Sequence, residues 1–439
     1  MGSSALAVIR TSGAGSLEAL SRLLKGGREL KKARGGTVHK ALICDGVEEL
    51  DEVLISVFQA PRSYTGEDGA EITCHGSLPV IRKLLSLLKR SGFRDAGPGE
   101  FTQRAFLNGK MDLTRAEAVN EIVRAKTDRA RALALQRLSG AVENRISEVR
   151  GALVDLRAGI EVRLDFPEDE AGAEAVDRRR LREAREMLAG LARTYRRGRI
   201  FQEGASVVIS GATNAGKSSL FNLLLKQDRA IVSEVHGTTR DFLEGLVGIE
   251  GIPVRLMDTA GMRAPKDAVE AEGIRRAEEA IEGAELVLYL VDSGAGITRA
   301  DGEFLSRGGG RPPLQAPVLP VWNKVDLAGR CPAPEGFIPV SSLTGQGIEA
   351  LEERIAAVLL DGASSEGAEP LIDSERQKVL LERAEEALGR FEESLDRGAA
   401  LDLLAVDLAE ALEALGEITG EVTSAEILER IFSTFCVGK

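Results

Sequence analysis

The 439-residue sequence predicts a multidomain protein that combines α/β and all-α parts. Three observations support this fold class. Residues 1–107 mix short apolar runs with turns, residues 108–201 and 366–439 have helical periodicity, and residues 202–365 alternate buried strands with helices. A chain of this length holds two or three hydrophobic cores, so several separate domains are expected.

The first region is predicted to be a small α/β domain. Its runs "EVLISVF" and "GAEITCHG" have the apolar and β-branched content of strands. One helix is expected near residues 78–90.

The helical region begins near residue 108. Its apolar residues step by four and three positions, as in the buried seam of a helix that packs on other helices. This seam contains Val142, Ile146, Val149, Leu153, Leu156 and Ile160. The pattern continues through "RRRLREAREMLAGLARTYRRGR" to about residue 200, and it resumes after the linker "DGASSEGAEP".

The region 202–365 is predicted to be a doubly wound parallel sheet. Its buried strands are expected in "SVVIS", "PVRLMD", "ELVLYLVD", "PVLPVW" and "FIPVS". The simplest interpretation is one domain inserted at 202–365 between two halves, 108–201 and 366–439, of a single helical domain.

Composition excludes several classes of protein. No apolar run is long enough for a transmembrane helix, and no secretory signal is visible, so a cytoplasmic protein that does not enter the membrane is expected. Four cysteines and three histidines show no zinc-ligand spacing. The net charge is −12, and residues 366–439 hold 18 acids against 7 bases, so a nucleic-acid partner is expected to avoid that segment.

The stretch "GATNAGKSS" follows a predicted strand and precedes an amphipathic helix, which is the context of a phosphate-binding loop. Gly211 and Gly216 allow close approach of the backbone, and the loop amides cradle phosphates. Lys217 is expected to reach the β- and γ-phosphates, and Ser218 to bind Mg²⁺. The candidate residues of this loop are Asn214, Ala215, Gly216, Lys217, Ser218 and Ser219.

The motif "NKVD" after a buried strand predicts which base is bound. The amide of Asn323 and the carboxylate of Asp326 suit guanine, whose N1–H and N2–H₂ groups are donors. Adenine would leave Asp326 unpaired, so the site is expected to reject ATP. The loop "SSL" after another strand is expected to touch the base. The candidate base-side residues are Asn323, Lys324, Asp326, Ser341, Ser342 and Leu343.

Two more motifs belong to the phosphate side. "DTAG" ends a strand where the γ-phosphate would lie, and it contributes Asp258, Thr259, Ala260 and Gly261. "TTRD" offers Thr239 as a second Mg²⁺ ligand. These motifs, in this order, indicate a GTPase of the translation-factor class.

A Ras-like GTPase carries a glutamine just after "DTAG" to orient the attacking water, but here that position is Met262. Two residues are candidates for the missing role. Glu270 follows "DTAG" closely, and the side-chain oxygen of Asn214 could bind a monovalent cation that acts as an arginine finger does. The alternative for Glu270 is a solvated acid at the start of a helix, a position that favours acids.

Longer stretches in all three regions resemble one family. They are "TGEDGAEITCHG", "PGEFTQRAFLNGKMDLTRAEAV", "LDFPED", "GATNAGKSSLFNLL", "AIVSEVHGTTRDFLE", "DTAGMR" and "EITGEVTSAEILERIFSTFCVGK". With them the chain resembles the tRNA-modification GTPases of the MnmE (TrmE) family along nearly its whole length. The resemblance implies an N-terminal folate-binding and dimerisation domain at 1–107, a helical domain, and an inserted P-loop (Ras-like) GTPase domain.

The resemblance also implies an activity. Members of the family form homodimers and work with a flavin-dependent partner, MnmG, as a heterotetramer. Together they install an aminomethyl or carboxymethylaminomethyl group at C5 of the wobble uridine, position 34, of certain tRNAs. The one-carbon unit comes from a 5-formyl- or methylene-tetrahydrofolate derivative. GTP hydrolysis is activated by K⁺ when two GTPase domains meet.

Site residues follow from the same resemblance. It assigns the water-positioning role to Glu270 and nucleotide contacts to the loop residues Ser233, Glu234, Val235, His236, Gly237, Thr238 and Thr239. The implied K⁺ ligands are Asn214, Ser233, Val235 and Thr238. The implied folate contacts are Arg10, Glu71, Lys110 and Lys439.

The C-terminal stretch "FCVGK" has two interpretations. A tail from the helical domain could return to the folate site and place Cys436 near the one-carbon unit, where the thiol is either a nucleophile or part of the packing. For the whole chain, the alternative function is a ribosome-assembly or regulatory GTPase switch. Such relatives often carry an RNA-binding module with a GxxG loop, and none stands out after residue 366.

Overall fold

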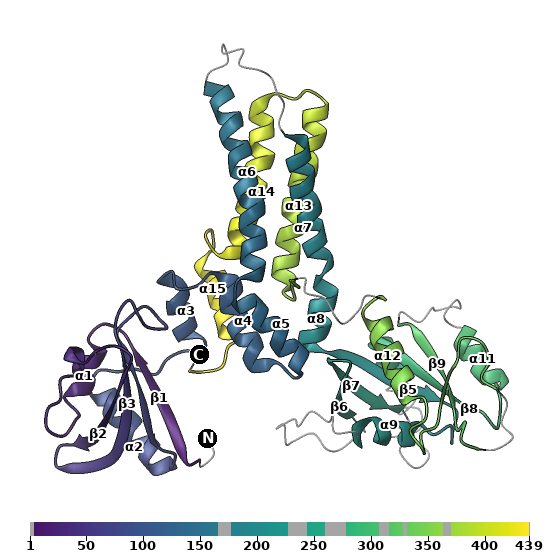
Figure 1. Cartoon of the computed structure of the whole chain (residues 1–439), viewed down its shortest axis with the longest axis horizontal. Coiled ribbons are helices and arrows are strands. Elements are labelled where there is room, and N and C mark those ends of the chain that lie inside the picture. Colours follow the sequence, from purple (N-terminus) through teal and green to yellow (C-terminus); the bar gives the residue numbers. More distant parts are fainter. Residues whose placement is uncertain are drawn as a thin grey trace. The chain divides into compact units, whose positions relative to one another are not determined.

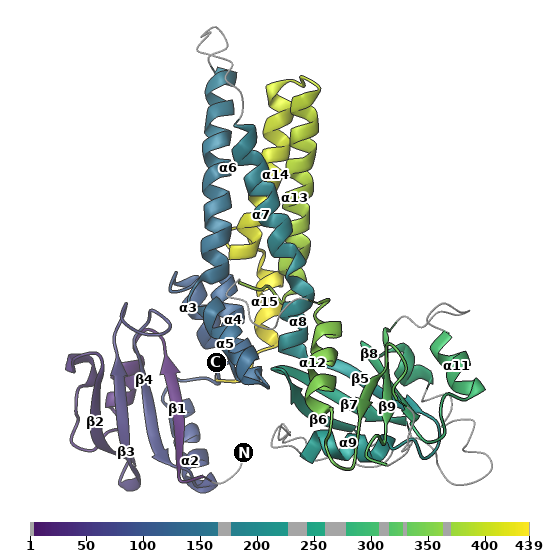
Figure 2. The same ribbon diagram turned by 45° about the vertical axis from the view of Figure 1, so that its right-hand side comes forward.

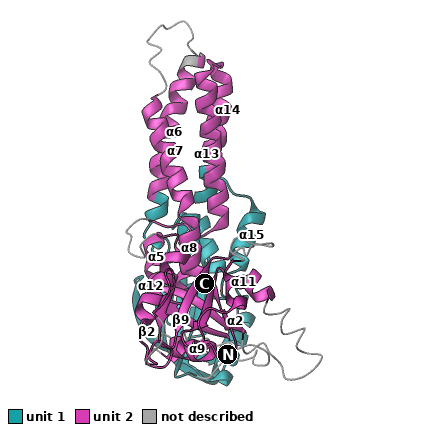
Figure 3. Cartoon of the chain, turned by 90° about the vertical axis from the view of Figure 1, so that its right-hand side faces the viewer, with its two compact units in different colours: residues 1–120, 138–143, 415–439 teal, residues 121–137, 144–414 magenta. Residues whose placement is uncertain are grey.

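The computed structural model describes residues 4–165, 177–226, 244–259, 278–306, 316–327, 332–362 and 370–438. The chain divides into two compact units (Figure 3). Unit 1 contains Met1–Asn120, Leu138–Glu143 and Leu415–Lys439, and unit 2 contains Glu121–Arg137 and Asn144–Ala414. None of the described helices is both long enough and apolar enough to span a bilayer.

Unit 1 is built on an antiparallel four-stranded sheet (Figure 1). Its order is β1-β4-β3-β2, and alternating residues such as Val53, Ile55 and Val57 are buried against the helices on one face. The predicted strands and the predicted helix at 78–90 are confirmed. The elements are β1 (Leu6–Ser12), α1 (Ser16–Ser21), η1 (Leu30–Lys32), β2 (Thr37–Asp45), β3 (Glu48–Phe58), β4 (Gly69–His75) and α2 (Leu78–Arg90).

The C-terminus of the chain packs with early helices in the same unit. A small apolar cluster joins Leu113 and Ala116 to Leu428, Phe432 and Phe435. Beyond it, Val437 forms a β-bridge with Pro98. The elements involved are α3 (Glu100–Leu107), α4 (Leu113–Arg124) and α15 (Ala425–Ser433).

Long helices form the bundle seen in Figures 1 and 2, where α6, α7, α13 and α14 run side by side. The predicted seam of α6 is buried at Val142, Ile146, Val149, Leu153 and Ile160, whereas Leu156 is half-buried. The helices of this part are α5 (Asp128–Leu138), α6 (Ala141–Asp165), α7 (Arg178–Arg193), α8 (Tyr195–Glu203), α13 (Glu375–Asp396) and α14 (Leu401–Thr419).

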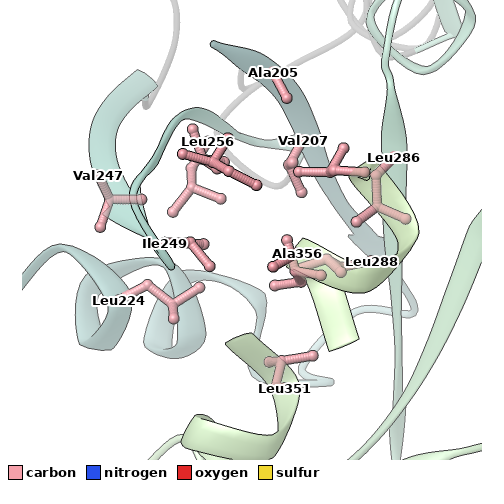
Figure 4. Packing of buried hydrophobic residues seen from close by; sticks show 14 of the residues in the cluster. Ala205, Val207, Leu224, Val247, Ile249, Leu256, Leu286, Leu288, Leu351 and Ala356 are labelled. Atoms are coloured by element: carbon pink, nitrogen blue, oxygen red, sulfur yellow. The ribbon is translucent and has the colours of Figure 1, made fainter. Parts of the chain in front are cut away.

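A six-stranded sheet of order β10-β9-β8-β5-β7-β6 follows α8. Helices α9 and α12 cover one face, where Leu224 and Leu351 pack on Val207 and Leu288 (Figure 4). On the other face Phe304 of α11 stacks on Tyr289. The elements are β5 (Ala205–Gly211), α9 (Lys217–Lys226), β6 (Glu244–Ile249), β7 (Ile252–Asp258), β8 (Leu286–Asp292), α11 (Arg299–Ser306), β9 (Val318–Asn323), β10 (Ile338–Val340) and α12 (Ile348–Leu359).

The predicted fold class is confirmed, with one addition. Strand β6 was not predicted, and it joins the sheet antiparallel to β7 at its edge. The turn between them, Glu250–Gly251, has φ values of 48° and 78°, which suit a two-residue hairpin. The four other pairings are parallel, so the sheet is mixed rather than wholly parallel. The domain boundaries proposed from the sequence stay a prediction.

Candidate nucleotide site

The phosphate loop lies between the end of β5 at Gly211 and the start of α9 at Lys217. Within it Gly216 has φ +97°, and a Cβ there would lie 2.2 Å from Nδ2 of Asn323. Only glycine fits both the backbone conformation and the close approach. The loop is thereby packed directly against the segment that carries "NKVD".

The ammonium of Lys217 is buried inside this loop. Its Nζ donates hydrogen bonds to the carbonyl oxygens of Gly211 at 2.9 Å and Ala212 at 2.8 Å. A buried cation held by backbone oxygens at a helix N-terminus can exchange those partners for phosphate oxygens, which bind it more strongly because they are charged.

Ser218 and Asp258 meet where α9 begins and β7 ends. Oγ of Ser218 donates to Oδ2 of Asp258 at 2.7 Å, and Asp258 is buried. A hydroxyl oxygen is a hard ligand of the kind that Mg²⁺ prefers, and the buried carboxylate of Asp258 holds it in place, so Ser218 fits the ion. Next to it, Oγ1 of Thr259 donates to the carbonyl oxygen of Ile209 at 3.0 Å and fastens the end of β7 to β5.

The base-side residues come from the ends of β9 and β10, which are parallel neighbours. Asn323 is fully buried, and its Nδ2 donates to the carbonyl oxygen of Ala215 at 2.7 Å. Its Oδ1 accepts from the backbone N and the Oγ of Ser342 at 3.1 and 2.9 Å. Asp326 accepts a hydrogen bond from Ser341. Four of the predicted base-side residues therefore lie together, whereas Leu343 is exposed.

Lys324 connects the base side to the phosphate loop. Its Nζ donates to the backbone oxygen of Asn214 at 2.6 Å and to Oδ2 of Asp292 at 2.7 Å. Both Lys324 and Asn214 have positive φ, 69° and 65°. Asp292 was missed in the sequence, although an acid at the carboxyl end of the buried strand "LVLYLVD" was a signal for it.

Several predicted site residues lie outside the described residues. They are Ser233, Glu234, Val235, His236, Gly237, Thr238, Thr239, Ala260, Gly261, Glu270 and Lys439.

In unit 1, Arg10 and Glu71 face each other across strands β1 and β4. Nε and Nη2 of Arg10 donate to Oε1 of Glu71 at 2.9 and 2.7 Å. The guanidinium also lies 5.7 Å from the ring centroid of Tyr64 and 5.5 Å from that of Phe101. Burial raises the pKa of Tyr64. The charges of Arg10 and Glu71 neutralise each other, a partnership that the sequence did not suggest.

The other predicted folate contacts are placed as follows. Nζ of Lys110 is exposed and donates to the carbonyl oxygen of Pro61 at 2.9 Å. The C-terminal tail reaches Arg10, whose Nη1 donates to the carbonyl oxygen of Gly438 at 3.4 Å. The backbone N of Gly99 donates to the carbonyl oxygen of Cys436 at 3.5 Å, and Cys436 itself is exposed. The tail thus lies beside the Arg10–Glu71 pair.

Comparison with known families covers both ends of the chain. Residues 113–436 match the family model described as the MnmE helical domain, and residues 1–110 match that of the GTP-binding protein TrmE N-terminus. The chain belongs to the MnmE family. The tRNA modification GTPase MnmE of Treponema denticola is 42% identical, covering 99% of this chain and 95% of that protein. The MnmE of Carboxydothermus hydrogenoformans is 40% identical over 100% and 97%.

Part of the chain also matches solved structures of GTP-binding proteins. A variant of Aquifex aeolicus Era bound to GDP.AlF4⁻ is 28% identical, with a TM-score of 0.29, and the match covers 42% of this chain and 66% of that one. From family membership the chain is a GTPase that acts in tRNA modification, and MnmE-family relatives of similar length match it from end to end.

Proposed function

We propose that this chain is the GTP-hydrolysing component of a complex that modifies C5 of the wobble uridine, position 34, of certain tRNAs. The added aminomethyl or carboxymethylaminomethyl group would take its carbon from a 5-formyl- or methylene-tetrahydrofolate derivative. The observation that supports this most strongly is the match of the whole chain to the MnmE family. The packed nucleotide site between Gly211 and Ser342 supports the GTPase part.

In this proposal each side of the nucleotide has its own residues. Lys217 and the loop amides hold the β- and γ-phosphates, and Ser218 with Thr239 binds Mg²⁺, which neutralises phosphate charge when bound. The carboxylate of Asp326 accepts the N1–H and N2–H₂ donors of guanine and is oriented by Ser341, and Asn323 holds the two loops beside the base together. Asp258 contributes to Mg²⁺ binding indirectly, because its carboxylate holds the Ser218 hydroxyl in place.

For hydrolysis we assign water positioning to Glu270 and K⁺ binding to Asn214, Ser233, Val235 and Thr238. A monovalent cation beside the phosphates supplies the positive charge that other GTPases take from an arginine finger. Asn214 suits this role because it lies at the centre of the phosphate loop, where Lys324 holds its backbone oxygen in place. Catalysis would be completed when two GTPase domains meet in a homodimer.

The folate site would involve Arg10, Glu71, Lys110 and Lys439. A folate carries a glutamate carboxylate for cations and a pterin with N–H donors for a carboxylate. The Arg10–Glu71 pair offers both groups, and the tail brings Cys436 and Gly438 to the same edge of unit 1. Cys436 is either a nucleophile toward the one-carbon unit or a packing residue.

The partners in the proposal are a second copy of the chain, a flavin-dependent MnmG-like protein in a heterotetramer, and tRNA, all in the cytoplasm. The acidic segment 366–439 would face away from tRNA, because like charges repel.

The test is reconstitution with an MnmG-like partner, tRNA, GTP, K⁺ and the folate derivative, followed by mass spectrometry of the wobble nucleoside. Modified uridine is expected with the native chain and none with Lys217→Ala. An unmodified nucleoside in the complete mixture, while GTP is hydrolysed at the native rate, would contradict the tRNA role and leave the GTPase assignment intact.

A further inference from the structure

Helix α5 in unit 2 is fastened at its start to the turn between β6 and β7. Oγ1 of Thr127, the residue before the helix, donates to the carbonyl oxygen of Gly251 at 2.7 Å. Oγ1 of Thr127 also accepts a hydrogen bond from the backbone N of Ala130 at 3.1 Å, so one hydroxyl both caps the helix and binds the hairpin.

The packing at this contact is tight. A Cβ on Gly251, which has φ +78°, would lie 2.8 Å from Cβ of Arg129 on the helix. The guanidinium of Arg129 lies 5.8 Å from the ring centroid of Phe201 in α8. Nζ of Lys126 donates to the carbonyl oxygen of Glu203, where α8 ends. The start of α5 therefore touches both the hairpin and the segment that leads into β5.

The far end of α5 is held by a buried cation. Arg137 is 4% exposed, and it donates to Glu121 at 2.6 Å and to Asp373 at 2.9 Å. It also donates to the carbonyl oxygen of Leu371 at 3.0 Å. Residues 371–373 lead directly into α13, so this end of the helix is tied to the bundle. A buried charge network of this kind resists rearrangement, because losing one partner leaves another buried charge uncompensated.

The hairpin that α5 holds also reaches the nucleotide site. From the turn, β7 runs to Asp258, whose carboxylate accepts from Ser218 at the start of α9. Strand β6 begins directly after the stretch 227–243, which carries "TTRD". Since β6 is the edge strand, the hairpin is hydrogen-bonded to the rest of the described sheet through the pairing of β7 with β5.

We propose that α5 transmits the conformational change of the β6–β7 hairpin on nucleotide binding to the helices of unit 2. The hydrogen bond between Thr127 and Gly251 is the contact through which it does so. A strand is stiff along its length, so a shift of Asp258 moves the turn about 20 Å away, roughly six residues at about 3.3 Å each. The displaced turn moves Thr127 and α5 with it. The hydrogen bonds of Arg137 at the far end of α5 pass this displacement to residues 371–373, which precede α13. The inference rests on the GTPase activity and not on the proposed folate, potassium or partner binding.

The test compares hydrogen–deuterium exchange of the α5 amides in the full-length protein with and without a non-hydrolysable GTP analogue. Thr127→Asp keeps an acceptor for the Ala130 amide but has no proton for Gly251, so it removes the contact and keeps the cap. Thr127→Ser keeps both. We expect the analogue to change exchange by about fivefold in the native protein and in Thr127→Ser, and by less than about twofold in Thr127→Asp.

Two further variants make the test specific. Asp177→Ala removes the N-cap of α7, where the carboxylate accepts from the amides of Arg179 and Arg180, and is expected to keep the response of α5. Thr127→Val keeps the side-chain shape without a hydroxyl and should behave as Thr127→Asp does. A native-sized response in Thr127→Asp and Thr127→Val, or none in the native protein, overturns the proposal. So does loss of GTP hydrolysis in Thr127→Asp, because the contact would then belong to the nucleotide site itself.

Discussion

Lys324 donates a hydrogen bond to the backbone oxygen of Asn214, so the residue next to Asn323 holds the centre of the phosphate loop. The two residues are 110 positions apart in the sequence. Asp292 accepts from the same ammonium and keeps it in place. One cation thus ties the end of β9 to the phosphate loop and to the end of β8.

The first prediction follows from that contact. Lys324→Ala should weaken GTP binding by about 1.5–3 kcal/mol, because a charge-assisted hydrogen bond that orders the loop is lost. Titration calorimetry measures the change. The control is Arg299→Ala, whose ion pair with Glu303 lies on the exposed surface of α11 and should change GTP affinity by less than about 0.5 kcal/mol. Equal affinity losses in the two variants would contradict a specific role for Lys324.

The second prediction concerns the base. Asp326→Asn presents an amide donor to the N1–H donor of guanine, so GTP should bind more weakly and xanthosine triphosphate should bind better than in the native protein. Competition binding with both nucleotides measures the exchange of specificity. Ser341→Ala is a useful companion, because it removes the hydroxyl that donates to Asp326 and accepts from the backbone N of Leu343 and Thr344, and it should weaken GTP binding without admitting xanthosine triphosphate. Unchanged GTP affinity in Asp326→Asn would refute the base assignment.

The third prediction concerns the cation. GTP turnover should be faster in K⁺ than in Na⁺ at equal ionic strength, and Asn214→Ala should abolish the difference. Removal of one transition-state charge contact typically costs about 10²–10³ in rate. Steady-state phosphate release measures both rates, and nucleotide affinity measured in parallel shows that binding survives. Equal rates of the native protein in K⁺ and Na⁺ would rule out the cation.

The fourth prediction concerns the tail. Deletion of residues 436–439 should weaken folate binding, because Gly438 contacts Arg10 and Lys439 offers a further charge. Loss of one charge-assisted contact costs about 1.5–3 kcal/mol, measurable by fluorescence titration with a tetrahydrofolate derivative.

Cys436→Ser should reduce wobble-uridine modification if the thiolate is the nucleophile. Modification at the native rate in Cys436→Ser would assign the thiol to packing, and GTP hydrolysis should be unchanged in both variants.

The fifth prediction concerns acid stability. The hydrogen bond from Arg94, with further ones from Gly97 and Arg104, lowers the pKa of Glu100 to about 2. Because the ordinary value is 4.5, folding favours the ionised carboxylate. This contribution to stability is present above pH 4.5 and is lost as the pH falls toward 2. The midpoint of thermal unfolding should therefore fall less steeply across that window in Glu100→Gln than in the native protein. An identical slope in the two proteins would contradict the assignment.

The sequence by itself determined the parts of the protein that depend on neighbouring residues. Gly216, Lys217 and Ser218 predict a phosphate loop because the strand, turn and helix that create it are contiguous. The buried face of α6 could be predicted in the same way, because the helical period of 3.6 residues decides which side chains share a face. Strand β6 was missed, since its six-residue run "EGLVGI" is short, contains two glycines and depends on pairing with β7.

Only the tertiary structure decided which distant groups meet. Arg10 pairs with Glu71 because β1 and β4 align in one register, and Arg10 reaches Gly438 across 428 positions of sequence. In the same way, Thr127 meets Gly251 only after α5 and the β6–β7 turn have packed together. The physical reason is that such contacts are set by sheet register and by the packing of remote elements, whereas local sequence specifies only the elements themselves.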